Sequence, residues 1–209
     1  MARAFAEIAF TNSVLGTQKQ QGSAESYAKF LTPDADKQDR LSEAETSFIQ
    51  ARDGFYQATV SKVGWPYVQF RGGPKGFVRV LDDKTIAYAD FRGNRQYVST
   101  GNLKENKRVS LILMDYPNRR RLKIWGRVTL IEAKDDPDLI ASLKSENYRA
   151  LPERAVIIKV EAFDWNCPQN IPQRLTMEEM EPHLSEMRDQ IIRLSAENET
   201  LKATLNSKS

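Results

Sequence analysis

Arginines and glycines share two turns of the sequence, and this combination suits the binding of a phosphate group. Arg71 stands directly before a Gly-Gly-Pro run, and Arg92 and Arg95 flank a Gly-Asn pair. Glycine tolerates positive φ and has no Cβ, so such a backbone can approach a ligand closely. The planar guanidinium group can donate to two oxygens at once. We therefore expect a phosphate-bearing cofactor at these turns.

The alternative for each of these cations is a solvated charge at a turn or a strand edge. A helix is predicted over 94–105, so Arg92 and Arg95 stand at its start, where free N–H groups and the helix dipole attract an anion. This placement favours the phosphate interpretation. For Arg71 a ligand role is also favoured, whereas for Lys75 the two interpretations are balanced.

The composition is that of an ordinary globular chain. The 209 residues are 40% hydrophobic and 28% charged, with a net charge of +3, which allows one buried core plus an appendage. This charge gives no argument for nucleic acid, and a solvated strand end explains the basic run 119–123. The single cysteine, Cys167, suits a reducing compartment. No apolar run has the length of a signal-peptide core or a membrane span, so we expect a cytoplasmic protein without a membrane partner.

Short strand patterns between turn signals predict a small β-barrel. The strands are expected at 55–62, 66–70, 77–81, 86–89, 109–114, 121–131 and 155–160. Tyr56, Ala58 and Val60 should share one face of the first strand, and the continuously apolar run 109–114 should be buried on both faces. Because closure removes exposed edges, this pattern indicates a closed or half-closed antiparallel barrel.

Three segments follow from the same patterns. Residues 1–40 are weakly patterned and are expected to be an N-terminal arm, in which the stretch 11–26 is expected to form a loop or a loosely packed arm. The barrel domain is expected over 41–174, and it begins with a capping box in which Ser42 and Glu45 start a short helix. Another helix should start at 133–137. Residues 175–209 are expected to form a helical tail.

The tail carries an apolar stripe with alternating spacings of three and four. Its members are Leu184, Met187, Ile191, Leu194, Asn198, Leu201 and Leu205. An ordinary amphipathic helix against the barrel is one interpretation. Asn198 at an a position, Glu197 at g and Lys202 at e favour a parallel two-stranded coiled coil instead. Such a short coil would need support from dimerisation of the barrels.

Other chemistry-bearing residues favour structural roles. A nucleophilic Cys167 would need a nearby base, and the only imidazole, His183, lies on a separate predicted helix. Burial as a small hydrophobe is therefore expected for Cys167, and a zinc site lacks ligands. Trp125 could stack on a ligand, but a strand tryptophan more often belongs to a core or an interface. Arg119 and Arg120 are interpreted as surface charges.

The order of these motifs resembles the pyridoxamine 5'-phosphate oxidase-like flavin-nucleotide-binding proteins over roughly 41–174. The segments RGGPKGF, DFRGNRQY and MDYPNRRRLKIWG together resemble one branch of that superfamily. The resemblance implies a mainly β fold with peripheral helices, an FMN-binding split β-barrel. It also implies a homodimer with two FMN molecules in clefts that the protomers share.

The resemblance further implies site residues. In the family, an arginine-led strand passes along the flavin ring, which corresponds here to Arg71, Lys75 and Gly76. The next strand–helix turn holds the phosphate, and its counterparts here are Ala89, Asp90, Arg92, Asn94, Arg95 and Gln96. Arg121 and Lys123 occupy the place that reaches the isoalloxazine of the neighbouring protomer. Trp165 and Arg174 fall near the late tryptophan–arginine pair of the family.

Two departures bear on the substrate. Pyridoxamine phosphate oxidases proper close with an arginine–leucine–histidine stretch, where this chain has NIPQR at 170–174. The arginine–lysine pair at the phosphate is replaced by RGNRQ. We therefore expect an FMN-dependent oxidoreductase with an unknown small-molecule substrate and electron donor, and no true pyridoxamine phosphate oxidase. No catalytic residue is assigned, because the flavin performs the redox chemistry. A non-catalytic flavin storage or sensor protein, or an oligomeric scaffold whose tail recruits partners, is the alternative.

Overall fold

The computed structural model describes residues 2–33, 36–145, 148–165 and 168–207. In this part of the chain, seven strands form one antiparallel sheet in the order β2-β1-β5-β6-β7-β4-β3. The strands are β1 Gly54–Val60, β2 Pro66–Gly72, β3 Arg79–Asp82, β4 Thr85–Phe91, β5 Arg108–Asp115, β6 Arg120–Glu132 and β7 Pro152–Trp165. The helices are α1 Ala4–Ala9, α2 Asn12–Gln20, α3 Ala24–Ala28, α4 Glu43–Gln50, α5 Val98–Glu105, α6 Pro137–Leu143 and α7 Met177–Asn206.

The sheet curls around one main core. β2 and β3 are its two edges and do not pair with each other within the described residues, so the barrel is half-closed, one of the two predicted forms. The main core is built from fully buried aromatic and aliphatic side chains, among them Phe55, Phe77, Tyr88, Leu111, Leu122, Ile124 and Ile158. A second cluster packs α6 against β4 and β7 through Ala87, Ala89, Ile140, Leu143 and Ala155.

Strand β1 shows how the period-2 pattern divides the sheet. Phe55, Gln57 and Thr59 are buried in the barrel, while Tyr56 and its alternate neighbours lie on the other face, as predicted. The buried amide of Gln57 accepts a hydrogen bond from the Tyr88 hydroxyl at 2.6 Å. Burial raises the pKa of Tyr88, so this phenol stays a neutral donor inside the core.

The predicted capping box is confirmed at the start of α4. The Ser42 N–H donates to the Glu45 carboxylate at 2.9 Å, and the Ser42 side chain caps the first turn. The indole of Trp165 donates to the other oxygen of Glu45 at 2.7 Å, and its ring packs edge-on against Phe48. The end of β7 is thereby attached to α4.

Two expectations about local structure are wrong. The stretch 11–26 is not a loop, since it contains α2 and the start of α3. Thr11 caps α2 and Gly22, at φ +72°, ends it. Neither helix buries a residue, so the alternative of a loosely packed arm is not contradicted. The run 109–114 is not buried on both faces, since Val109, Leu111 and Leu113 are buried and the residues between them are only half-buried. The outer face of the sheet is therefore partly uncovered at β5.

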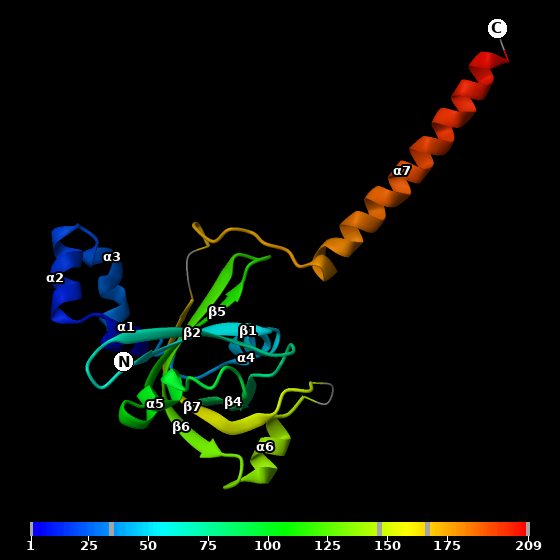
Figure 1. Ribbon diagram of the computed structural model, residues 1–209. Helices are drawn as coiled ribbons and strands as arrows, with labels where there is room; N and C mark the ends of the chain where they lie inside the picture. The colour runs from blue at the N-terminus through cyan, green and yellow to red at the C-terminus, as the bar shows by residue number, and fades with distance from the viewer. Residues whose placement is uncertain (1, 34–35, 146–147, 166–167, 208–209) are drawn as a thin grey trace.

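Element boundaries also differ from expectation. The helix predicted over 94–105 starts only at Val98, because Arg95 and Tyr97 have left-handed backbones with φ of 63° and 54°. β7 is longer than the predicted 155–160. The helical tail is present as α7, which extends away from the barrel as a single rod (Figure 1). Among the described residues, no helix is both long and apolar enough to cross a membrane.

Candidate functional site

A polar cavity opens where the sheet is split, between the edge strand β2, strand β4 and the start of α5. Its volume is about 220 Å³. The lining side chains and backbone come from Gln69, Arg71, Asp90, Phe91, Gly93, Asn94, Arg95, Tyr97, Ser99, Thr100, Glu153 and Arg154. The pairings Phe55↔Arg71 and Gln57↔Gln69 between β1 and β2 place Arg71 and Gln69 on the buried face of the sheet.

A buried ion network forms the floor of this cavity. Asp90 accepts from Arg71 at 2.5 Å and from Arg154 at 2.7 Å. The side chain of Arg71 is 16% exposed, that of Asp90 5% and that of Arg154 8%. Burial works against the charge of Arg154, but the hydrogen bond and the charge of Asp90 outweigh it and raise the pKa of Arg154. Arg154 therefore stays charged in spite of its burial.

One donor of this network has no partner among the residues that the structure describes. The Nε of Arg71 is buried and makes no hydrogen bond among the described residues. A buried donor without a partner costs free energy comparable to a lost hydrogen bond. Arg154, in contrast, also meets Glu132 at 3.3 Å and Glu153 at 3.4 Å. Arg71 is thus the arginine with spare donor capacity beside the cavity.

The turn before α5 brings a further arginine to the cavity. Asn94 accepts from the Gln96 N–H at 3.2 Å, and Arg95 follows with its left-handed backbone. Such strain at a non-glycine residue is typical of functional turns. Ser99 in the first turn of α5 donates to Gln69 at 3.0 Å, so the helix start is attached to β2. No side chain caps α5, which leaves N–H groups of its first turn for an anion.

The other predicted site residues lie outside this cavity. Arg92 is 53% exposed and pairs with Glu153 at 3.4 Å. Lys75 pairs with Glu178 of α7 at 3.3 Å, and Gly76, at φ +80°, lies next to the end of α4. The side chain of Ala89 packs toward α6.

The predicted residues of β6 and of the chain after it also lie elsewhere. Lys123 pairs with Asp164 at 2.9 Å, and the buried Nε of Arg121 has no partner in the described residues. Trp165 is held at Glu45, and Arg174 stands over the ring of Tyr116 at 5.1 Å. One protomer therefore brings Arg71, Asp90, Asn94 and Arg95 together and keeps the others apart.

Sequence reasoning missed Arg154. It stands at the start of β7, and its partner Asp90 is 64 positions earlier in the chain, so no local motif joins them. The register Asp90↔Arg154 between β4 and β7 places them side by side. A charged residue directly before the apolar run 155–158 was the one available signal, because a charge at that place needs a partner.

The outer face of β2, β1 and β5 is apolar and open. Tyr56, Val68 and Phe70 are exposed there, and the rings of Tyr56 and Phe70 lie 5.4 Å apart. Burial and a hydrogen bond to Tyr56 raise the pKa of Tyr116. A groove of about 420 Å³ continues this face toward α1 and Trp125. Exposed apolar surface of this kind is a candidate for an interaction site.

Trp125 has a structural environment within that groove. Its indole donates to Ser110 at 2.8 Å, and its ring lies 4.9 Å from Phe5 of α1. The interpretation as a packing residue is therefore favoured over ligand stacking.

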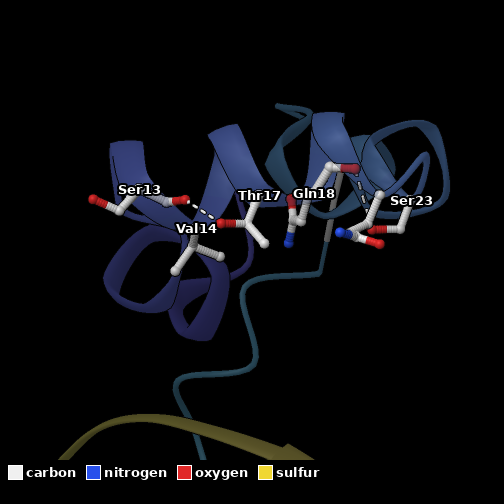
Figure 2. Close-up of a pocket in the computed structure, with 6 residues that line it drawn as sticks. Ser13, Val14, Thr17, Gln18 and Ser23 are labelled. Atoms are coloured by element: carbon white, nitrogen blue, oxygen red, sulfur yellow. Dashed lines mark hydrogen bonds between the residues drawn. The ribbon is translucent and has the colours of Figure 1, made fainter.

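A second hollow, between α2 and α3, carries no comparable chemistry. Figure 2 shows two of its polar side chains, Thr17 and Ser23, hydrogen-bonded to backbone carbonyls of nearby residues. Thr17 donates to the Ser13 carbonyl at 2.9 Å and Ser23 to that of Gln18 at 3.5 Å. No charged side chain lines it among the described residues.

The remaining candidates form no site either. Within the described ranges no group of three metal-ligating side chains occurs. His183 lies on the exposed helix α7, whereas the expected burial of Cys167 concerns a position outside the described residues.

The antiparallel sheet with peripheral helices and a polar cavity at its split matches the split-barrel class of proteins. Residues 41–165 match the family described as pyridoxamine 5'-phosphate oxidase. Since the match spans more than half of the chain, the protein belongs to this family, as its motifs predicted.

The chain is similar to several solved structures. A HupZ variant from Group A Streptococcus is 17% identical, with 60% of this chain and 98% of that chain covered and a TM-score of 0.49. An FMN-binding protein from Syntrophomonas wolfei is 11% identical, with 75% and 98% covered and a TM-score of 0.47. General Stress Protein 26 from Bacillus anthracis is 15% identical, with 57% and 88% covered and a TM-score of 0.44. No curated protein matches the chain.

Proposed function

We propose that this protein binds FMN and serves as an oxidoreductase for a small molecule. The observation that carries the proposal is the polar cavity, where Arg71, Arg95 and Arg154 converge and the Nε of Arg71 lacks a partner within the described residues. Guanidinium groups are suited to a phosphate. Membership of the family and the FMN-binding protein of similar architecture support the flavin as the cofactor.

The cavity fits part of such a cofactor. Its volume of about 220 Å³ lies below the roughly 300–1,000 Å³ of pockets that enclose a whole ligand. Its lining is polar and cationic, which suits the phosphate and the adjoining hydroxylated chain. The aromatic ring system then needs a second surface. Because the cavity takes only the polar part of the cofactor, the ring system is expected to bind a surface of a neighbouring protomer.

The residues of the cavity have distinct roles in this proposal. Arg95 and the N–H groups of the first turn of α5 would bind the phosphate. Arg71 would donate a further hydrogen bond to the cofactor from its unpartnered Nε–H. Asp90 would orient Arg71 and Arg154 without contacting the phosphate, because two anions repel. A bound flavin supplies the electron-transfer chemistry. The protein binds and orients it, and no protein acid or base is assigned.

The second surface is proposed to come from another copy of the chain. The open apolar face with Tyr56, Val68 and Phe70 has the character of a dimer interface. Arg121, with its own buried and unpartnered Nε, lies on β6 and would serve the neighbouring site, as the family resemblance implies. The heptads of α7 would add a coiled coil to the same dimer. The single cysteine supports a place in the reducing cytoplasm.

Storage or sensing of FMN without turnover is a second candidate. It is favoured by the size of the cavity, because about 220 Å³ accounts for the phosphate end of the cofactor and leaves no assigned place for a substrate. Anaerobic mixing of the FMN-loaded protein with NADH or NADPH, followed by air, separates the two candidates. An oxidoreductase that uses either donor bleaches and recovers its flavin colour with multiple turnovers. Bound flavin that resists both donors at every concentration would contradict the use of a nicotinamide and favour storage.

A further inference from the structure

Helix α7 presents an apolar stripe that is half-exposed at Met180 and Leu184 and exposed at its other apolar positions. It is 30 residues long, and none of them is buried. Because the helix begins at Met177, the stripe starts one heptad earlier than Leu184: Met177 takes an a position and Met180 a d position. The seam thus runs from Met177 to Leu205, along about 45 Å of helix. An isolated exposed helix of this kind gains most of its stability from packing of its apolar face.

We propose that α7 pairs with α7 of a second copy as a parallel, in-register, two-stranded coiled coil. The inference builds on the dimer proposed above and specifies the orientation and register of its tail. Figure 1 shows α7 extending away from the barrel, and only its start is tied to the barrel, through Glu178 and Lys75 at 3.3 Å. From Met187 onward the apolar stripe residues are 56–67% exposed, which leaves them accessible to a second helix. The occupant is identified by the seam itself, which is self-complementary.

Asn198 decides between the possible arrangements. In a parallel, in-register pair, each a residue meets its own symmetry mate, so the two Asn198 amides hydrogen-bond to each other. An antiparallel pair brings a positions opposite d positions, and Asn198 would then face a methionine or leucine. A parallel pair shifted by one heptad would place it opposite Ile191 or Leu205. Both arrangements leave a polar group unpaired in the seam, which costs free energy.

The flanking residues agree with this arrangement. Glu197 at g faces Lys202 at e of the neighbouring helix in a parallel pair, and the symmetry mate repeats the contact. Pro182, the one proline within α7, falls at an f position, which points away from the seam. Its ring therefore does not obstruct the partner helix. Arg188 at e is paired with Glu181 of its own helix at 2.8 Å, so it brings no free charge to the seam.

A spin-label distance measurement tests orientation and register directly. Ala203 occupies an exposed f position and would be changed to cysteine in full-length, FMN-loaded protein that also carries Cys167→Ser. In the parallel coil the two labels lie at the same height. In an antiparallel pair with Asn198 opposite Met187, they are about 30 Å apart along the axis. We expect a single short distance, and a long distance or no defined distance would overturn the proposal.

The chain offers a matched pair of control variants. Ile191 and Ile192 are adjacent, alike and both exposed at 60% and 67%, but only Ile191 lies in the seam. Ile191→Asp should abolish the short distance, whereas Ile192→Asp should keep it. Equal effects of the two variants would contradict the seam. FMN binding measured on the same samples separates the two proposals: intact binding with no coil refutes only the coil, and failed binding with an intact coil refutes only the flavin site.

Discussion

The buried ion network makes Asp90 the most informative residue to change. Asp90→Asn keeps the shape of the side chain but removes the anion between Arg71 and Arg154, which it meets at 2.5 and 2.7 Å. Removing one partner of a buried ion pair costs about 3–5 kcal/mol, because the other charge remains buried. Arg154 keeps its contacts to Glu132 and Glu153. We therefore expect a loss near the lower end, about 3 kcal/mol of unfolding free energy.

Urea unfolding in phosphate-free buffer measures this loss. Asp83→Asn is the matched control, since its pair with Arg40 is on the surface, with side chains 49% and 64% exposed. An exposed pair is worth only about 0–1 kcal/mol. Added inorganic phosphate should restore more stability to Asp90→Asn than to the unchanged protein, because an anion that binds the folded state stabilises it. A loss below about 1 kcal/mol for Asp90→Asn, equal to that of the control, would show that the arginines are solvated and the argument is wrong.

Four further predictions concern the site, the fold and the assembly. Arg95→Ala should weaken FMN by about 1.5–3 kcal/mol in calorimetric titrations and leave riboflavin nearly unchanged. Arg92, which pairs with Glu153 outside the cavity, should matter less. Equal losses for both ligands would remove Arg95 from the phosphate site. The FMN-loaded protein should not oxidise pyridoxamine phosphate or pyridoxine phosphate, because the arginine–histidine closing stretch is absent; efficient formation of pyridoxal phosphate would contradict this. Although burial opposes its charge, hydrogen bonds from Ser42 and Trp165 hold the pKa of Glu45 below its ordinary 4.5. The stability from ionised Glu45 is therefore present above pH 4.5 and is lost as the pH falls through the folded-state pKa. In denaturant unfolding, Glu45→Gln should cost about 1–2 kcal/mol of unfolding free energy at pH 7. A cost that stays constant as the pH is lowered would refute the assignment. Truncation after Arg174 should leave an FMN-binding dimer, measured by light scattering, with a lower melting temperature in thermal unfolding. A monomer after truncation would show that α7 holds the dimer. An unchanged melting temperature would show that α7 is unpaired.

The sequence was informative where the signal is local. The alternation in β1 and the box formed by Ser42 and Glu45 depend on neighbours a few positions apart, and both were predicted. Arg71, Asp90 and Arg95 were chosen from two glycine turns and family motifs, and the fold brings them to one cavity. The match at 41–165 confirms the family.

What escaped prediction depends on distant contacts. Arg154 reaches Asp90 only through the register of β4 with β7. Ala89 and Asp90 are adjacent in sequence, yet Ala89 faces α6 and Asp90 faces the cavity. Their roles differ because they lie on opposite sides of the sheet. The helices of residues 1–40 were missed because α2 and α3 bury no residue, so they lack the apolar pattern from which helices are predicted.

The most direct test of the account is a paired titration of the purified protein with FMN and riboflavin, followed by calorimetry and flavin fluorescence. The two ligands share the ring and the ribityl chain and differ only in the phosphate. We predict one FMN per protomer and at least about tenfold tighter binding of FMN than of riboflavin, which corresponds to about 1.4 kcal/mol. Equal affinities, or no binding of either ligand, would contradict a phosphate-bearing flavin held by Arg71 and Arg95.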